Sequence, residues 1–193
     1  MSNIIDEINK VRSKLKKGPA DTLLLQKPFA KGMYSFSMFI VDYYSRVRHQ
    51  LKIDFDSFMI VQTVVSHNLY LLSKKRKTSN SYKELEAEWD DMISKYEKAT
   101  DLLGNFVPQS DSKLTISSIC LVTGLPKETV RRKTVELVKR NLLINSKSNG
   151  ITLGSAYKRV FQDFVPETVM GVVKLLKNWE KNGVLKNLLE FKI

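Results

Sequence analysis

The side chains best suited to chemistry lie in one short segment of this sequence. Residues 127–133 read KETVRRK, and Arg131 and Arg132 can each present paired N–H donors to an acceptor. Arginine pairs bidentately with guanine edges, and both lysine and arginine neutralise phosphates. The segment therefore predicts noncovalent recognition of nucleic acid. The residues predicted to contact DNA are Lys127, Glu128, Thr129, Arg131, Arg132, Lys133 and Lys147.

A helix predicted over residues 126–141 positions this segment. Pro126 suits the first helical position, because its missing N–H is not needed there and its φ is already helical. The positions predicted to face inward recur at spacings of four, three and four, and they are Val130, Thr134, Leu137 and Asn141. At about 100° per residue, Arg132 lies nearly opposite this stripe. The basic side of the helix is therefore expected to face the solvent.

The helical phase also divides the roles of the polar side chains. Thr129 lies near the start of the helix and Arg132 lies opposite the inward stripe, so these two are expected to meet base edges. Charged side chains at the margins are expected to meet phosphates, namely Lys127, Arg131 and Lys133. A purely structural helix with a solvated basic face is the alternative interpretation.

Two neighbouring elements complete a module. Residues 115–123 predict a shorter helix that begins with a threonine, whose hydroxyl can cap free N–H groups. Gly124 then permits the tight turn that a helix-turn-helix requires. Asn149-Gly150 between two apolar runs predicts a hairpin, the wing, with Lys147 as its only cation. Residues 113–154 therefore predict a winged helix-turn-helix.

The run TGLPKETVRRKTVELVKRNLLI resembles the recognition half of bacterial winged-helix transcription regulators. The shared features are a turn glycine, a Thr-Val-x-Arg segment, a leucine seven residues after the valine, and an apolar strand before the wing. The resemblance spans residues 113–153. It implies a regulator of transcription that binds double-stranded DNA.

Charge is unevenly distributed along the 193 residues, whose formal net charge is +12. Residues 1–53 hold ten Lys or Arg against four Asp or Glu, residues 54–112 seven against ten, and residues 113–193 fifteen against six. A basic surface attracts nucleic acid, although an anionic membrane would also bind one. The concentration of charge around the helix-turn-helix favours nucleic acid.

Cysteine content and the first residues both predict a cytoplasmic protein. One cysteine excludes an intramolecular disulfide framework, and MSNIIDEINK carries acids where a secretory signal carries a basic and then an apolar run. The most apolar run, residues 58–72, contains polar residues and is shorter than the ~20 needed to span a bilayer. We therefore expect a buried helix there and no membrane partner.

The expected fold is mainly α: a winged helix-turn-helix with a two-stranded wing plus additional N- and C-terminal helices. Residues 1–112 are expected to form a helical accessory and dimerisation region that contains a central buried helix at 54–73. Residues 155–193 predict C-terminal helices whose apolar stripes also suit dimerisation. Residues 18–32 and 74–81 show no clear period, and no helix is predicted there.

Helices before the module and a long helical pair after it resemble the multiple-antibiotic-resistance repressor class. That resemblance implies a homodimer built from the terminal helices and a small-molecule effector, and a dimer implies a near-palindromic site. The chain departs from this class by interposing residues 74–112 and by lacking an Asp-x-Arg in its wing. The alternative function is an interaction module for RNA or for a protein assembly.

Other chemistries lack their sequence patterns. There is no phosphate-cradling glycine loop, no Cys/His cluster with metal spacing and no nucleophile elbow in the sequence. His67 and Cys120 lie on apolar helical stripes, which is typical of core residues rather than of a metal ligand or a redox sensor. The sequence therefore predicts neither an enzyme, nor a bound cofactor, nor a metal.

Overall fold

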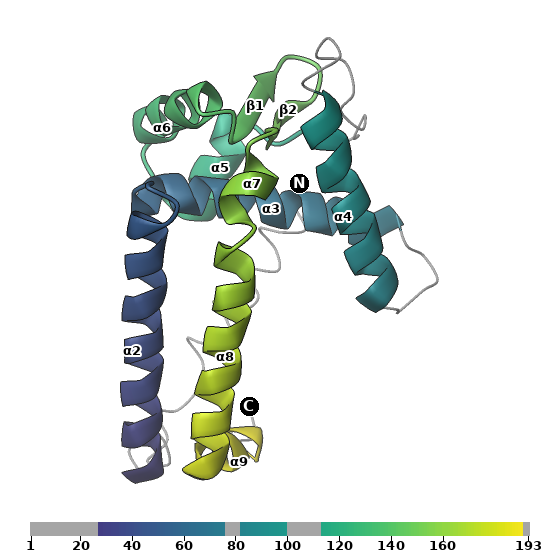
Figure 1. Cartoon of the computed structure of the whole chain (residues 1–193). Helices are drawn as coiled ribbons and strands as arrows, with labels where there is room; N and C mark the ends of the chain where they lie inside the picture. Colours follow the sequence, from purple (N-terminus) through teal and green to yellow (C-terminus); the bar gives the residue numbers. More distant parts are fainter. Residues whose placement is uncertain (1–26, 76–81, 100–112, 191–193) are drawn as a thin grey trace. The chain divides into compact units, whose positions relative to one another are not determined.

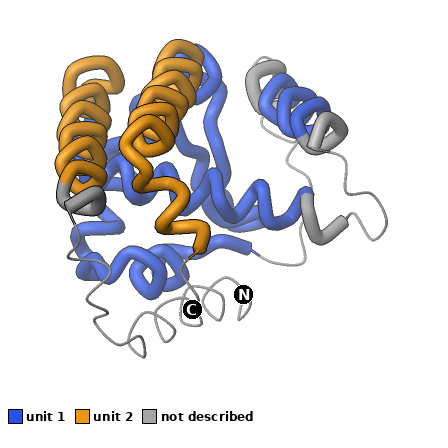
Figure 2. Tube along the Cα trace, turned by 90° about the horizontal axis from the view of Figure 1, so that it is seen from below, with its two compact units in different colours: residues 1–5, 53–161 blue, residues 6–52, 162–193 orange. Residues whose placement is uncertain are grey.

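The computed structural model describes three stretches of the chain, residues 27–75, 82–99 and 113–190 (Figure 1). They fall into two compact units: of the described residues, unit 1 contains those within 53–161, and unit 2 contains residues 27–52 and 162–190 (Figure 2). The described part is mainly helical with a two-stranded antiparallel sheet, which confirms the predicted fold class. Of the accessory region predicted at residues 1–112, residues 1–26, 76–81 and 100–112 lie outside the described residues.

Unit 1 is built around α3 (Phe55–Lys75), the helix predicted to be central. Asp54 caps it by accepting a hydrogen bond from the Ser57 N–H (2.8 Å). Its buried residues lie on several sides and are Ser57, Phe58, Ile60, Val61, Thr63, Val64, His67 and Asn68. The elements that contact it are α4 (Tyr82–Ala99), α5 (Ile116–Thr123), α6 (Lys127–Lys139) and β2 (Gly150–Leu153).

These contacts explain why the compact units differ from the predicted division at residue 112. A helix that is apolar on most sides must bury all of them, and in unit 1 the helix-turn-helix covers α3. Within the same unit α4 packs on α7 (Tyr157–Phe161), where the rings of Trp89 and Tyr157 meet edge to face at 6.4 Å. Unit 1 therefore contains α3 and α4 together with the predicted module.

The predicted helix-turn-helix is present in α5 and α6, with the local interactions expected from its sequence. Thr115 caps α5, because its hydroxyl accepts a hydrogen bond from the Ser118 N–H (3.2 Å). Gly124 ends α5 with φ 74°, a left-handed conformation that glycine adopts without strain. Pro126 is the residue before α6 rather than its first helical residue, and its carbonyl accepts the Val130 N–H (3.0 Å).

The predicted inward position of Asn141 is wrong, although the rest of its stripe is right. Val130, Thr134 and Leu137 are buried, whereas Asn141 is exposed and lies beyond the end of α6. Its φ of 56° is left-handed, and asparagine tolerates this conformation better than most residues do. The chain therefore turns at Asn141, and a helical period cannot be extended through it.

The wing pairs β1 (Leu143–Ser146) with β2, in a register that joins Leu143 to Leu153 and Ser146 to Gly150. The strand β1 extends past the apolar residues into Asn145 and Ser146, so the loop is residues 147–149. Leu114 adds a bridge that the sequence analysis missed, because its carbonyl accepts the Ile151 N–H (2.9 Å). A side chain at Gly150 would lie 2.4 Å from that carbonyl oxygen, which explains the glycine.

Unit 2 pairs α2 (Lys27–His49) antiparallel with α8 (Phe164–Lys181), and α9 (Val184–Leu189) packs at one end (Figure 1). The expectation of irregular structure up to residue 32 is wrong for residues 27–32, which begin α2. A proline is tolerated in a first turn, and the glycine at position 32 serves packing. A Cβ on Gly32 would lie 2.6 Å from the Val184 side chain.

Candidate nucleic-acid interface

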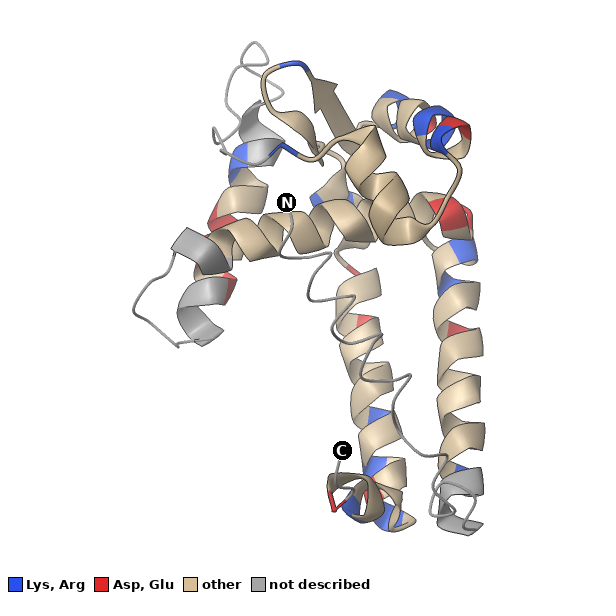
Figure 3. Cartoon of the chain, turned by 180° about the vertical axis from the view of Figure 1, so that it is seen from behind, with Lys and Arg blue, Asp and Glu red and all other residues tan. Residues whose placement is uncertain are grey.

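The exposed side of α6 carries most of the residues predicted to contact DNA. Because Val130, Thr134 and Leu137 face the core, the opposite side presents Glu128 and Arg132. Exposure separates the predicted residues further: Thr129 and Lys133 are half-buried, and the exposed ones are Lys127, Glu128, Arg131, Arg132 and Lys147. In the ribbon of Figure 3, several Lys and Arg positions lie on α6, beside acidic ones, and another lies in the wing loop.

Arg131 and Glu128 form a two-bonded ion pair in the first turns of α6. Arg131 donates from Nε to one carboxylate oxygen (2.9 Å) and from Nη2 to the other (2.6 Å). The hydrogen bonds from Arg131 lower the pKa of Glu128, and the same carboxylate raises the pKa of Arg131. Both groups are therefore charged at neutral pH, and the two hydrogen bonds orient the guanidinium toward Glu128.

Lys133 occupies a different environment from the other predicted cations. Its side chain is only 12% exposed, and its Nζ pairs with Asp54 at the start of α3 and lies 3.7 Å from Glu136. The hydrogen bond to Asp54 raises the pKa of Lys133. Burial alone would raise the pKa of Asp54, but the hydrogen bonds from Lys133 and Ser57 outweigh it and lower that pKa. Lys133 therefore joins α6 to α3.

The wing brings a further cation to the basic side chains of the module. Lys147 is exposed in the wing loop, and its backbone carbonyl accepts a hydrogen bond from Lys113 Nζ (3.2 Å). The two lysines are far apart in the sequence, and only the bridge of Leu114 to Gly150 brings their segments together. The sequence therefore offered no local signal for Lys113.

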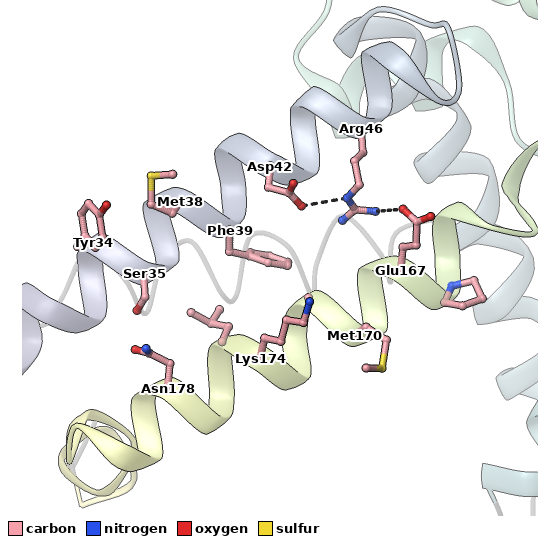
Figure 4. Close-up of a pocket in the computed structure, with 13 residues that line it drawn as sticks. Tyr34, Ser35, Met38, Phe39, Asp42, Arg46, Glu167, Met170, Lys174 and Asn178 are labelled. Carbon is pink, nitrogen blue, oxygen red and sulfur yellow. Dashed lines mark hydrogen bonds and ion pairs between the residues drawn. The ribbon is translucent and has the colours of Figure 1, made fainter.

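A groove with a volume of about 750 Å³ lies between α2 and α8 within unit 2 (Figure 4). Arg46 stands at one end, where its Nε donates to Asp42 (3.0 Å) and its Nη1 donates to the Thr168 hydroxyl (3.2 Å). Apolar side chains line the middle, among them Met38, Phe39, Met170 and Leu175. Exposed apolar side chains continue along both helices beside it.

Over the described stretches, no three His, Cys, Asp or Glu side chains come together as a potential metal site. His67 is buried in α3, and Cys120 is half-buried in α5. None of the helices in these stretches combines the length and the apolar character needed to cross a membrane.

Comparisons with protein-family models, with curated proteins and with solved structures found no match to this chain.

Proposed function

We propose that this protein is a sequence-specific regulator of transcription that binds double-stranded DNA as a homodimer through its winged helix-turn-helix. The observation that carries the proposal is the second helix of the motif, α6. It buries one face completely and exposes Lys127, Arg131 and Arg132 on the other. A helix with a basic outer face after a tight turn suits the major groove, where its first turns reach base edges.

The predicted contacts divide between bases and phosphates. Arg132 lies on the side of α6 opposite the buried stripe, so it would reach into the groove. Lys127 at the start of the helix, Lys147 in the wing and Lys113 beside the wing would neutralise phosphates. Lys133 already forms an ion pair with Asp54, so it is not assigned to a phosphate.

Unit 2 supports the dimer. The helix α8 uses one side for α2 and exposes a second apolar stripe at helical spacing, which comprises Val165, Val169, Val172 and Leu176. The helix α2 adds exposed apolar side chains, including Met33, Tyr34, Phe36, Met38, Val41 and Tyr44. Large exposed apolar patches mark interaction sites, and a two-fold dimer buries the same patch on both copies. Two linked modules would favour a near-palindromic site.

The groove between α2 and α8 also has the size of a small-molecule site. We assign the exposed apolar side chains of α2 and α8 to the second copy. A small-molecule effector stays a prediction from the resemblance. It would be detected as a ligand that changes the DNA affinity of the intact dimer.

The experiment is binding to a pool of genomic duplex fragments, followed by titration of a selected and a scrambled duplex at low and at physiological salt. A DNA regulator should select a sequence and lose affinity steeply as salt rises. Equal competition by RNA, or a shallow salt dependence, would support the alternative, an interaction module for RNA or a protein assembly.

A further inference from the structure

The ion pair between Glu128 and Arg131 does more than the sequence analysis assigns to its two residues. We propose that Glu128 and Arg131 act as one guanine-reading unit, in which the carboxylate holds the guanidinium so that its outer edge faces the base. The inference rests on the proposed DNA binding and names the residues that determine specificity within it. It replaces the phosphate contact expected of Arg131.

The pairing geometry leaves the edge of the guanidinium that does not contact Glu128 facing outward. A guanidinium carries five N–H donors in a fixed fork. Arg131 approaches Glu128 side-on, with Nε and one N–H of Nη2 engaged (2.9 and 2.6 Å). One N–H of Nη1 and the second N–H of Nη2 form the other edge. These parallel donors match O6 and N7 of guanine, which is the commonest bidentate contact to a base.

The position of the pair along α6 places this edge where bases are read. Glu128 lies two residues before the buried Val130, so it projects about 160° away from the core. Arg131, one residue after Val130, starts from the flank of the helix, and the ion pair draws its guanidinium toward the outer face and the first turn. The first turns of a recognition helix are the part that contacts base edges.

The pair has no evident role in folding. The side chain of Arg131 is 62% exposed and that of Glu128 is 73% exposed, and ion pairs in such positions add little stability. Holding a flexible arginine in its bound orientation instead reduces the entropy that it loses on binding. A carboxylate on this face also repels phosphates. Glu128 therefore favours the matched guanine and weakens binding to other DNA.

Lys133 provides an internal contrast on the same helix. Its carboxylate partner, Asp54, caps α3, and the lysine side chain is nearly buried. That pair fixes the helix in the unit. The pair of Glu128 and Arg131 is made within α6 and is exposed, so it can dock onto a base without disturbing the packing.

The experiment uses the full chain, the duplex selected from the genomic pool, and duplexes that carry each other base at every position. The variants are Glu128→Gln and Arg131→Lys, with Glu136→Gln as the matched control. Glu136 is also an exposed acid of α6, so its loss changes the net charge equally without touching Arg131. Circular dichroism establishes that each variant is folded.

Glu128→Gln and Arg131→Lys should each lose about tenfold of the preference at the same G·C pair, because lysine cannot pair bidentately. The double variant should lose no more than either single one. Glu128→Gln should also raise affinity for scrambled DNA, as Glu136→Gln should. Arg131→Lys should leave the salt dependence unchanged, because the charge is kept.

Two results would overturn the inference while the proposed function stands. One is a folded Arg131→Lys protein that keeps every base preference, and the other is a Glu128→Gln protein indistinguishable from Glu136→Gln. If the unaltered chain prefers no duplex at all, the proposed function fails and this inference fails with it.

Discussion

Of the large apolar side chains that the structure describes as exposed, unit 1 contributes Phe55, Leu121 and Val135, whereas unit 2 contributes twelve, spread over α2, α8 and α9. In unit 1 the apolar residues of α3, α5, α6 and the wing bury one another, and exposure falls on charged residues of α6. In unit 2 the two long helices bury one side each and expose the other. The described part of unit 1 thus exposes few large apolar side chains, whereas unit 2 exposes an apolar surface of the kind that marks interaction sites.

The largest expected effect tests the packing of the buried side of α6 in unit 1. Leu137→Ala should lower the free energy of unfolding by about 2–5 kcal/mol, because the leucine side chain is 1% exposed and its removal leaves a cavity. Val135→Ala is the control on the same helix, since Val135 is 44% exposed and should change stability by less than about 0.5 kcal/mol. Urea unfolding measures both, and equal losses would contradict the described phase of α6.

The next effect tests whether the exposed apolar surface of unit 2 forms a dimer interface. At micromolar concentration, light scattering should report about twice the chain mass of 22.2 kDa. Val169→Glu should return the mass to that of one chain, because a buried unpaired carboxylate costs more than tenfold in affinity. Leu121→Glu places the same charge on an exposed apolar residue of unit 1 and should leave the dimer intact.

A monomeric protein before any substitution would contradict the dimer directly. A Val169→Glu protein that still has twice the chain mass would remove α8 from the interface, and Met38→Glu would then test α2.

Features of unit 1 that depend on the local spacing of residues could be predicted from the sequence. Helical periods gave the phase of α6 and the central place of α3, because apolar spacing reports which side of a helix is buried. A spacing of three between Glu128 and Arg131 is a known signal for an ion pair, so that pair was open to prediction. The sequence analysis assigns both residues to DNA contacts and does not predict the pair.

Other features depend on segments that are distant in the sequence. Lys133 and Asp54 are 79 residues apart, and nothing in either segment indicates the partner. The close approach of Gly32 to Val184 likewise depends on the fold, and the sequence around Gly32 does not show that this glycine lies within a helix. The backbone of Asn141 is left-handed, so the helix cannot continue through this residue, and the spacing of apolar residues does not reveal such a turn.

A smaller effect distinguishes cations held inside unit 1 from those on its surface. Lys133→Gln should leave the salt dependence of DNA binding unchanged, because Lys133 already pairs with Asp54. Lys127→Gln, the control, should reduce the slope by about one phosphate, because Lys127 is exposed. Asp54→Asn should free Lys133 and increase the slope by up to about one. A loss of one phosphate in Lys133→Gln would instead support the contact expected from the sequence.

The smallest effect is the pH dependence of the link between Asp54 and Lys133. The pKa of Asp54 is lowered, so its contribution is present above its unfolded pKa of about 3.9 and is lost as the pH falls through the lower folded value. The pKa of Lys133 is raised, so its contribution is full below about 10.4 and is lost as the pH rises through the higher folded value. The pair therefore stabilises unit 1 between about pH 4 and pH 10.

Asp54→Asn isolates this term, because asparagine caps a helix about as well as aspartate does. The side chain of Asp54 is half exposed, so solvent screening should hold the difference in unfolding free energy below about 1 kcal/mol at pH 7. Urea unfolding of both proteins from pH 2 to pH 11 should show the difference shrinking toward zero at the acid end. A difference that persists unchanged at pH 2 would show that Asp54 acts through packing or capping instead of charge. In that case the ion pair would not be what fixes α6 against α3.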